Sequence, residues 1–378
     1  MRQLRIFQSI EATTNASVPE NQTWRRNLYE PLVDLGHDVL LFPAAKARDA
    51  MLRNSVSACA SFSEELLELF LEEHKKKPFD LFFSYFMDGM IDPLAIDEIR
   101  KAGVQTCNFS CNNVHQFELV DGLSPHFDYC LHAEKDVADK FTAVGANPVW
   151  WPMASNPKYF YPRQTPRDIR VSFVGANYGL RPQYVLFLLS NGVDVHVYGP
   201  GWIGGRRSML KRYQLALKAC LVFSPEASYR SSSGLAERDL RILVEKRYPR
   251  NVHNPVSDED LISLYSRSEI SLGFLEVYDG HEPSKGVKQH LHLREFEAPM
   301  SGALYCTGYS DELAEMFEPD TEFISYQSES ELLDKVSYYL THPAEAEKIR
   351  MAGHSRALRD HTYQKRFKDL FCKVGLAG

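Results

Sequence analysis

A basic and an acidic side chain stand three positions apart in the segment LREFEAPMSGALYCTGY, residues 293–309. Its pattern predicts a short polar-faced helix over 294–301, which Gly302 ends, followed by a buried strand over 303–307. Arg294 and Glu297 would then share one face of the helix. A guanidinium fork suits a diphosphate, and a carboxylate with two oxygens suits the hydroxyls of a ribose. The pair therefore indicates a nucleotide-sugar site; the simpler alternative is an exposed ion pair of little consequence.

Four further residues could complete such a site. Lys285, in EPSKG, could add a point charge to the diphosphate. The run VGANYGLRP predicts a strand and then a tight turn at Gly175 that frees backbone amides for phosphate, with Arg181 beside it. The run YGPGW could present Trp202 to a base or a sugar ring. The alternatives are a plain chain reversal at Gly175 and a packed indole at Trp202.

Two residues of the first half are candidates for a general base. His115 lies in NFSCNNVHQFE and Asp88 in SYFMDGM, each after a predicted strand. The ordinary pKa of histidine, roughly 6.5, suits proton transfer. The alternative for both residues is a side chain that stabilises its own loop.

No metal site is predicted. Cys107, Cys111 and His115 are spaced as CxxxCxxxH, but no fourth ligand lies close by in the sequence, so zinc is not favoured. The acidic run over 258–260 opens a predicted helix, where negative charge is ordinarily stabilised by the helix dipole. Phosphate charge would then be neutralised by Arg, Lys and helix N-termini.

Strands and helices alternate in both halves of the chain. Apolar runs predict helices over 23–35, 65–74, 257–266 and 328–340 and from 343 onwards, between strands over 4–7, 39–42, 81–85, 106–109, 129–131, 149–151, 170–174, 193–198, 251–253, 270–274, 303–307 and 322–325. Four prolines in 152–168 predict a linker. The expected fold class is α/β, with two doubly wound Rossmann-like domains facing across a ligand cleft. The alternatives are one continuous sheet or two unrelated domains.

Bulk properties limit the class of protein. A chain of 378 residues favours two domains, and its net charge of −7 argues against nucleic acid as the main partner. No apolar run reaches the roughly 20 residues of a membrane span, and the N-terminus lacks a signal-peptide pattern. Seven cysteines without a CxxC pair indicate a cytoplasmic protein. The basic segment 204–222 suggests peripheral contact with the inner membrane face or an anionic glycan; an amphipathic helix packed on the sheet is the simpler interpretation.

The C-terminal half resembles the CgeB-like glycosyltransferases, a GT-B branch related to the large group 1 family. That family's pattern is R-x-F-E, Gly, a strand, D-E-L, F-x-P-x-x-E and a late H-T-Y. The matching residues in this chain are Arg294, Phe296, Glu297, Gly302, Asp311, Glu312, Leu313, Phe317, Pro319, Glu322, His361, Thr362 and Tyr363. The segments FDLFFSY and HFDYCLHAEKDVADKF also resemble that family's first domain, so the resemblance covers most of the chain and is strongest over 291–370.

The resemblance implies an organisation and an activity. Residues 1–165 would form an acceptor-side domain, 166–355 a nucleotide-sugar domain, and 356–378 a helix that crosses back to the first domain. The protein would transfer a sugar from a UDP-, GDP- or dTDP-linked donor to a hydroxyl of a glycan, protein or lipid-linked acceptor, without a metal or a further cofactor. His115 or Asp88 would position or deprotonate that hydroxyl. Two other interpretations stay open: a non-catalytic scaffold that binds nucleotide sugar or glycan, and a sugar-nucleotide epimerase of the same fold.

The resemblance also implies roles for particular residues. The wider group carries two glutamates eight positions apart, of which Glu297 would be the later one, contacting the ribose. The earlier position falls at Gln289, beside His290. Neither is a glutamate, so either one of them substitutes or the donor site differs.

Overall fold

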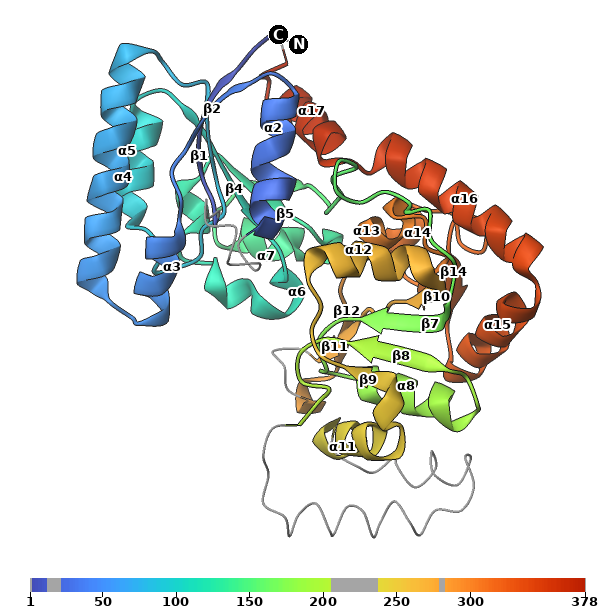
Figure 1. Cartoon of the computed structure of the whole chain (residues 1–378). Coiled ribbons are helices and arrows are strands. Elements are labelled where there is room, and N and C mark those ends of the chain that lie inside the picture. The colour runs from blue at the N-terminus through green and yellow to red at the C-terminus, as the bar shows by residue number, and fades with distance from the viewer. Residues whose placement is uncertain (1, 12–21, 205–236, 279–282, 378) are drawn as a thin grey trace. The chain divides into compact units, whose positions relative to one another are not determined.

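The chain forms two compact α/β units in a computed structural model that describes residues 2–11, 22–204, 237–278 and 283–377 (Figure 1). Unit 1 comprises Met1–Asn156 and Asp360–Gly378, and unit 2 comprises Pro157–Arg359. The sequence places its boundaries at 165/166 and 355/356, whereas the units change at 156/157 and 359/360. The basic segment 204–222 lies outside the described residues, apart from Gly204.

Unit 1 is built on a six-stranded sheet with the order β2-β1-β3-β4-β5-β6. Every adjacent pair is parallel. The strands are β1 (Arg5–Ser9), β2 (Asp38–Leu41), β3 (Leu81–Ser84), β4 (Gln105–Ser110), β5 (Tyr129–His132) and β6 (Pro148–Trp150). All six predicted strands are therefore present, because each is a short apolar run between turn residues.

Helices cover both faces of this sheet. The ring of Phe82 packs against Phe70 of α4 (Val56–Lys76), with ring centroids 6.3 Å apart. The ring of Phe83, the next residue, lies 5.4 Å from that of Phe367 in α17 (Tyr363–Lys373). Successive side chains of a strand point to opposite faces, so α4 and α17 cover opposite sides. The last helix of the chain thus belongs to the core of unit 1.

The remaining helices of unit 1 differ in part from the prediction. The single helix expected over 23–35 is divided into α1 (Gln22–Trp24), a π-helical turn (Arg25–Tyr29) and α2 (Glu30–Asp34). Helix α4 begins well before residue 65, at a point where Ser55 accepts a hydrogen bond from the backbone N–H of Ala58. Its first turns, VSACASFS, are rich in small polar residues and carry little apolar periodicity. The others are α3 (Ala45–Leu52), α5 (Pro93–Lys101), α6 (Asn113–Gln116) and α7 (Ala138–Ala143).

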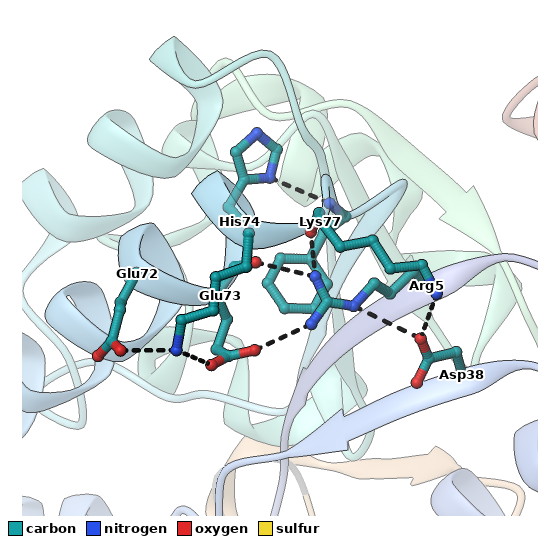
Figure 2. Close-up of polar contacts among 8 residues, drawn as sticks. Arg5, Asp38, Glu72, Glu73, His74 and Lys77 are labelled. Carbon is teal, nitrogen blue, oxygen red and sulfur yellow. Dashed lines mark hydrogen bonds and ion pairs between the residues drawn. The ribbon is translucent and has the colours of Figure 1, made fainter.

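Arg5 joins a cluster of charged side chains at the amino ends of β1 and β2 (Figure 2). At the first residue of β1, Arg5 donates from Nη1 to the carbonyl of Glu73 (2.9 Å) and from Nη2 to its Oε2 (3.0 Å). Its Nε lies 3.5 Å from Oδ2 of Asp38, and its guanidinium carbon lies 4.3 Å from the ring centroid of Phe79. Arg5 also bonds the carbonyl of Lys77, so its side chain joins the end of α4 to two strands.

Unit 2 contains a second parallel six-stranded sheet, with the order β14-β13-β10-β7-β8-β9. The strands are β7 (Ile169–Val174), β8 (Val195–Tyr198), β9 (Val252–His253), β10 (Ser268–Leu272), β13 (Tyr305–Gly308) and β14 (Ile324–Tyr326). They confirm the six strands predicted for this half. An antiparallel hairpin of β11 (Glu276–Tyr278) and β12 (Val287–Gln289) was not predicted, because three-residue strands give no clear alternation.

One face of this second sheet is covered by α8 (Arg181–Ser190), α11 (Glu237–Arg247) and α15 (Glu329–Thr341). Val185, Val244 and Val336 of these helices join Val171 and Val195 of the strands in one apolar core. Figure 1 shows α12 (Asp258–Arg267), α13 (Arg294–Met300) and α16 (Pro343–Asp360) on the other face, and α14 (Asp311–Ala314) follows β13. Each unit is thus wound on both sides of its sheet, as predicted.

Capping confirms two predicted helix starts. Ser257 accepts from the backbone N–H of Asp260 at the start of α12, and Ser328 accepts from that of Glu331 at the start of α15. Within the described ranges, no helix is both long and apolar enough to cross a lipid bilayer.

Candidate functional site

The strand order of unit 2 changes direction between two central strands. The chain runs from β7 outward to β8 and β9, then returns to place β10 on the other side of β7. In open α/β sheets, ligands bind at such a point, beyond the carboxyl ends of the strands. Gly175 follows β7 and Gly273 follows β10, so these two glycines flank the expected ligand position.

Both glycines are required because other side chains cross over the strand ends. A Cβ at Gly175 would lie 2.7 Å from Nη2 of Arg294, and a Cβ at Gly273 would lie 1.8 Å from the hydroxyl of Tyr305. Distances below 3.0 Å leave no room for any larger residue unless its neighbours move. The structure therefore brings Arg294 and Gly175, two residues predicted to bind the donor, together at the switch point.

Arg294 is held in place without using all of its donors. Its Nε and Nη1 are buried and have no hydrogen-bond partner among the described residues. Its guanidinium carbon lies 5.4 Å from the ring centroid of Phe173. Desolvation opposes its charge, but attraction to Glu295 and to the hydroxyls of Tyr305, Tyr265 and Tyr178 raises its pKa. A charged guanidinium with unused donors at a ligand-binding edge is suited to an anion.

The helix that carries Arg294 is not the exposed polar-faced helix that the sequence predicts. Glu295 is 1% exposed and Glu297 is 7% exposed, and the residues that follow them in the helix are buried as well. The helix is enclosed by its neighbours: Glu295 accepts from the hydroxyl of Tyr305 in β13, and Nδ1 of His354 in α16 lies 3.3 Å from the carbonyl oxygen of Pro299. The charged residues of α13 are therefore buried with its apolar ones. Burial excludes the exposed ion pair considered as the alternative for Arg294 and Glu297.

Glu295 is a buried charged residue that sequence reasoning missed. Its Oε1 accepts from the hydroxyl of Tyr305 (2.6 Å), and its Oε2 accepts from the backbone N–H of His292. Burial raises the pKa of this carboxyl, while Arg294 and the bond from Tyr305 act against the rise. Its only signal in the sequence is that it is a third charged residue in R-E-F-E. The prediction considered only Arg294 and Glu297, because residues three apart share a face of a helix.

Arg181 lies close to Arg294, but its side chain donates hydrogen bonds to the loop that precedes it. It is 1% exposed, and it donates to the carbonyl of Ala176 (3.0 Å) and to the hydroxyl of Tyr178 (2.7 Å). Nε2 of His292 lies 3.0 Å from its Nη2. Burial, and then repulsion from Arg294, lower the pKa of Arg181 to about 10. The guanidinium groups of Arg181 and Arg294 thus lie close enough to interact with each other and with the carboxylate of Glu295.

Trp202 does not face a ligand. It is completely buried, and its Nε1 donates to the carbonyl of Gly175 (2.8 Å). Gly199 and Gly201, with φ of 153° and 85°, turn the chain so that the indole points inward. The prediction that Trp202 stacks on a base or sugar is wrong, and the packed indole is the correct alternative.

The other donor-site candidates lie around the hairpin. Nε2 of Gln289 donates to the carbonyl of Tyr309 (2.7 Å) on the exposed face of β12. His290 is 3% exposed, with its ring 4.3 Å from that of His292. Lys285 is exposed in a short 3-10 turn, Pro283–Lys285. The ring of His290 thus contacts that of His292, which in turn contacts Arg181. Donor-binding roles for Gln289, His290 and Lys285 stay predictions.

The two general-base candidates occupy different settings in unit 1. Both oxygens of Asp88 accept backbone N–H groups, from Leu123 (2.8 Å) and Gly122 (3.0 Å). Burial raises the pKa of Asp88, and these two bonds oppose the rise. This geometry favours the loop-stabilising alternative for Asp88. His115 is 7% exposed on α6, and its role stays a prediction.

The zinc interpretation finds no support in unit 1. Sγ of Cys111 lies 3.0 Å from the hydroxyl of Tyr85, and burial raises the pKa of this thiol to about 12. Burial also raises the pKa of Cys107. Across the described residues, no three His, Cys, Asp or Glu side chains come together as metal ligands.

Comparison with known proteins agrees with this architecture. Residues 186–371, just under half of the chain, match the family described as "Glycosyl transferase-like". No curated protein matches the chain in sequence. Sucrose-phosphate synthase from Thermosynechococcus elongatus is similar in structure, with a TM-score of 0.62 and 14% identity over 100% of both chains.

Two more solved structures are similar. A glycosyltransferase from Rickettsia africae has a TM-score of 0.61 and 13% identity, over 100% of this chain and 99% of that one. Anabaena HepE, in complex with UDP and glucose, has a TM-score of 0.57 and 8% identity, over 99% of this chain and 100% of that one. The chain has the GT-B fold, and the family match over 186–371 lies largely within its second unit.

Proposed function

We propose that the protein transfers a sugar from a nucleotide-sugar donor to an acceptor hydroxyl, and that unit 2 holds the donor at the carboxyl ends of β7 and β10. The observation that carries the proposal is Arg294, whose unpartnered Nε and Nη1 lie at the switch point of a GT-B sheet. The match to a glycosyl transferase-like family over 186–371 adds independent support.

The proposed chemistry follows from the charge of this site. When the glycosidic bond of a donor breaks, negative charge develops on the leaving diphosphate. Arg294 can donate two hydrogen bonds to that diphosphate from a fixed fork, and Arg181 adds positive charge nearby. Glu297, on the helix that carries Arg294, is proposed to accept from the ribose hydroxyls. A UDP-sugar is the first donor to test, because HepE is seen in complex with UDP-glucose.

Metal independence and the absence of a further cofactor are part of the proposal. Two guanidinium groups can neutralise a diphosphate without a divalent ion. Release of UDP from UDP-glucose, measured with and without EDTA, tests this point. A rate that falls to background in EDTA and returns with Mg²⁺ or Mn²⁺ would contradict it.

The main experiment measures nucleotide release from UDP-, GDP- and dTDP-glucose in the presence of a panel of glycan, peptide and lipid-linked acceptors. Release that depends on an acceptor is the expected result. Binding of a nucleotide sugar without release would instead show a scaffold, and interconversion of the sugar without an acceptor would show an epimerase. His115→Ala should preserve donor binding and lower turnover if His115 is the general base.

A further inference from the structure

A further acidic side chain, Glu276, lies close to the carboxyl end of the sheet in unit 2. Glu276 is the first residue of β11, in the segment that follows β10. Its Oε1 accepts from the hydroxyl of Tyr184 on α8 (3.0 Å). Its Oε2 is buried without a hydrogen-bond partner among the residues that the structure describes. A buried carboxylate oxygen that is left unsatisfied calls for a ligand, because its desolvation is costly.

Two residues close to Glu276 are glycines. A Cβ at Gly308, the last residue of β13, would lie 3.4 Å from Oε1. A Cβ at Gly179, in the loop after β7, would lie 3.3 Å from the carbonyl oxygen of Glu276. Because both residues are glycines, neither has a side chain that could cover Glu276.

The neighbour across the hairpin does not satisfy Glu276 either. Gln289 is its direct partner in the β11–β12 pair, so the two side chains project to the same side. However, the amide of Gln289 donates to the carbonyl of Tyr309 (2.7 Å). Oε2 of Glu276 therefore keeps its acceptor capacity, in a segment that follows β10 and lies close to Gly308 at the end of β13 and to Gly179 in the loop after β7.

We propose that Glu276 accepts hydrogen bonds from the hydroxyl groups of the donor's sugar ring and so contributes to donor specificity. The proposal rests on the proposed function, since it assigns a part of the same donor site. A carboxylate repels phosphate and accepts hydrogen bonds from neutral hydroxyls. The guanidinium of Arg294 attracts phosphate and donates hydrogen bonds to it. A nucleotide sugar would accordingly place its diphosphate toward Arg294 and its hexose toward Glu276.

Calorimetry with matched ligands tests this assignment. The wild type and Glu276→Gln are compared in their affinities for UDP and UDP-glucose. GDP, dTDP and their glucose conjugates are measured in parallel. The expected result is a 10- to 100-fold weaker affinity for the sugar conjugate, with the affinity for the free nucleotide unchanged within about twofold, since only one charge-assisted hydrogen-bonding site is lost. Thermal unfolding checks that each variant is folded.

Glu269→Gln is the matched control, because Glu269 lies near the opposite end of β10 and bonds Arg170. This control should change neither affinity. A 2-deoxy or other deoxy-sugar conjugate provides a second test: the loss of affinity on removing the hydroxyl that Glu276 contacts should shrink in Glu276→Gln, as expected for a directly coupled pair.

The outcomes separate the two proposals. Equal weakening of UDP and UDP-glucose, or no weakening of either, overturns the assignment of Glu276 while leaving the donor site intact. If no nucleotide or nucleotide sugar binds the folded wild type, the proposed function itself fails, and the role of Glu276 fails with it.

Discussion

Two arginines, each near the strand ends of one sheet, differ in how many of their hydrogen-bond donors have partners. Arg5, at the amino end of the sheet in unit 1, bonds two carbonyls and a carboxylate (Figure 2). It also lies over the ring of Phe79. Arg294, at the carboxyl edge of the sheet in unit 2, leaves Nε and Nη1 without a partner among the described residues. A protein gains stability from an arginine whose donors are satisfied, and it can bind a ligand with one whose donors are not.

The acidic neighbours differ in the same way. Bonds from Lys76 and Arg5 lower the pKa of Glu73 in unit 1. Burial raises the pKa of Glu295 in unit 2, although Arg294 is near. The cluster around Arg5 therefore behaves as a structural ion-pair network, whereas burial beside Arg294 carries an electrostatic cost for the charged form of Glu295. The comparison leads to four predictions.

Arg294→Ala should have the largest effect. Loss of a bidentate guanidinium should weaken the affinity for UDP by about 100-fold or more, since charge-assisted bonds contribute roughly 1.5–3 kcal/mol each. Titration calorimetry with UDP measures the change. Arg294→Lys should recover only part of the affinity, because an ammonium lacks the planar fork. UDP affinity that is unchanged in Arg294→Ala would remove the basis of the donor site.

Gly175→Ala should have a smaller effect on the same quantity. The added methyl group would lie 2.7 Å from Nη2 of Arg294 and 2.8 Å from Cζ of Phe173, so the guanidinium has to shift. UDP affinity should fall about tenfold, since a displaced donor keeps part of its interaction. If Gly175→Ala binds UDP as the wild type does, Arg294 is not fixed by its contact with this glycine.

Arg5→Ala should leave UDP affinity unchanged and lower the free energy of unfolding of unit 1 by about 2 kcal/mol, because several hydrogen bonds and a ring contact are lost together. Urea unfolding, followed by a probe in unit 1, measures this. A fall in UDP affinity without a fall in stability would contradict the contrast between the two arginines.

The smallest expected effect is a difference between Glu73 and Glu295 in how each contributes to stability as the pH changes. A lowered pKa means that Glu73 adds stability above pH 4.5, the ordinary value for a glutamate, and that this stability is lost as the pH falls through the lowered pKa. The pKa of Glu295 is raised, so its dependence on pH has the opposite sign. The stability that Glu295 adds is fully present below pH 4.5 and is lost as the pH rises through the raised pKa.

Glu73→Gln and Glu295→Gln should therefore change the slope of unfolding free energy against pH in opposite directions. Denaturant titrations at a series of pH values on either side of 4.5 measure both slopes. Slopes that change in the same direction would show that the two carboxyl groups do not differ as described.

Much of the fold could be predicted from the chain alone. All the strands of the two six-stranded sheets were expected, since buried parallel strands are short apolar runs that end at Gly or polar residues. The hairpin of β11 and β12 and the early start of α4 were not expected. Both depend on partners distant in sequence or on residues with weak periodicity.

The candidate site was predicted only in part. Arg294 and Gly175 were identified by residue type and by their place after a strand or before a helix, and the structure brings them together. Glu295, Tyr305 and Glu276 were missed, because each is defined by neighbours on other strands and helices. Trp202 was misassigned, since an aromatic residue after a strand has the same pattern whether it packs inward or faces a ligand.

The sequence by itself determined the alternation of strands and helices, the two-unit architecture and the residues available for an anion site, because apolar periodicity and residue chemistry are local properties. Only the tertiary structure decided which charged groups are satisfied. Arg5 and Arg294 are the same residue type near regular elements, yet hydrogen-bond partners come from segments distant in the sequence, such as Glu73 for Arg5. The proposed function depends on that difference in pairing, which folding alone establishes.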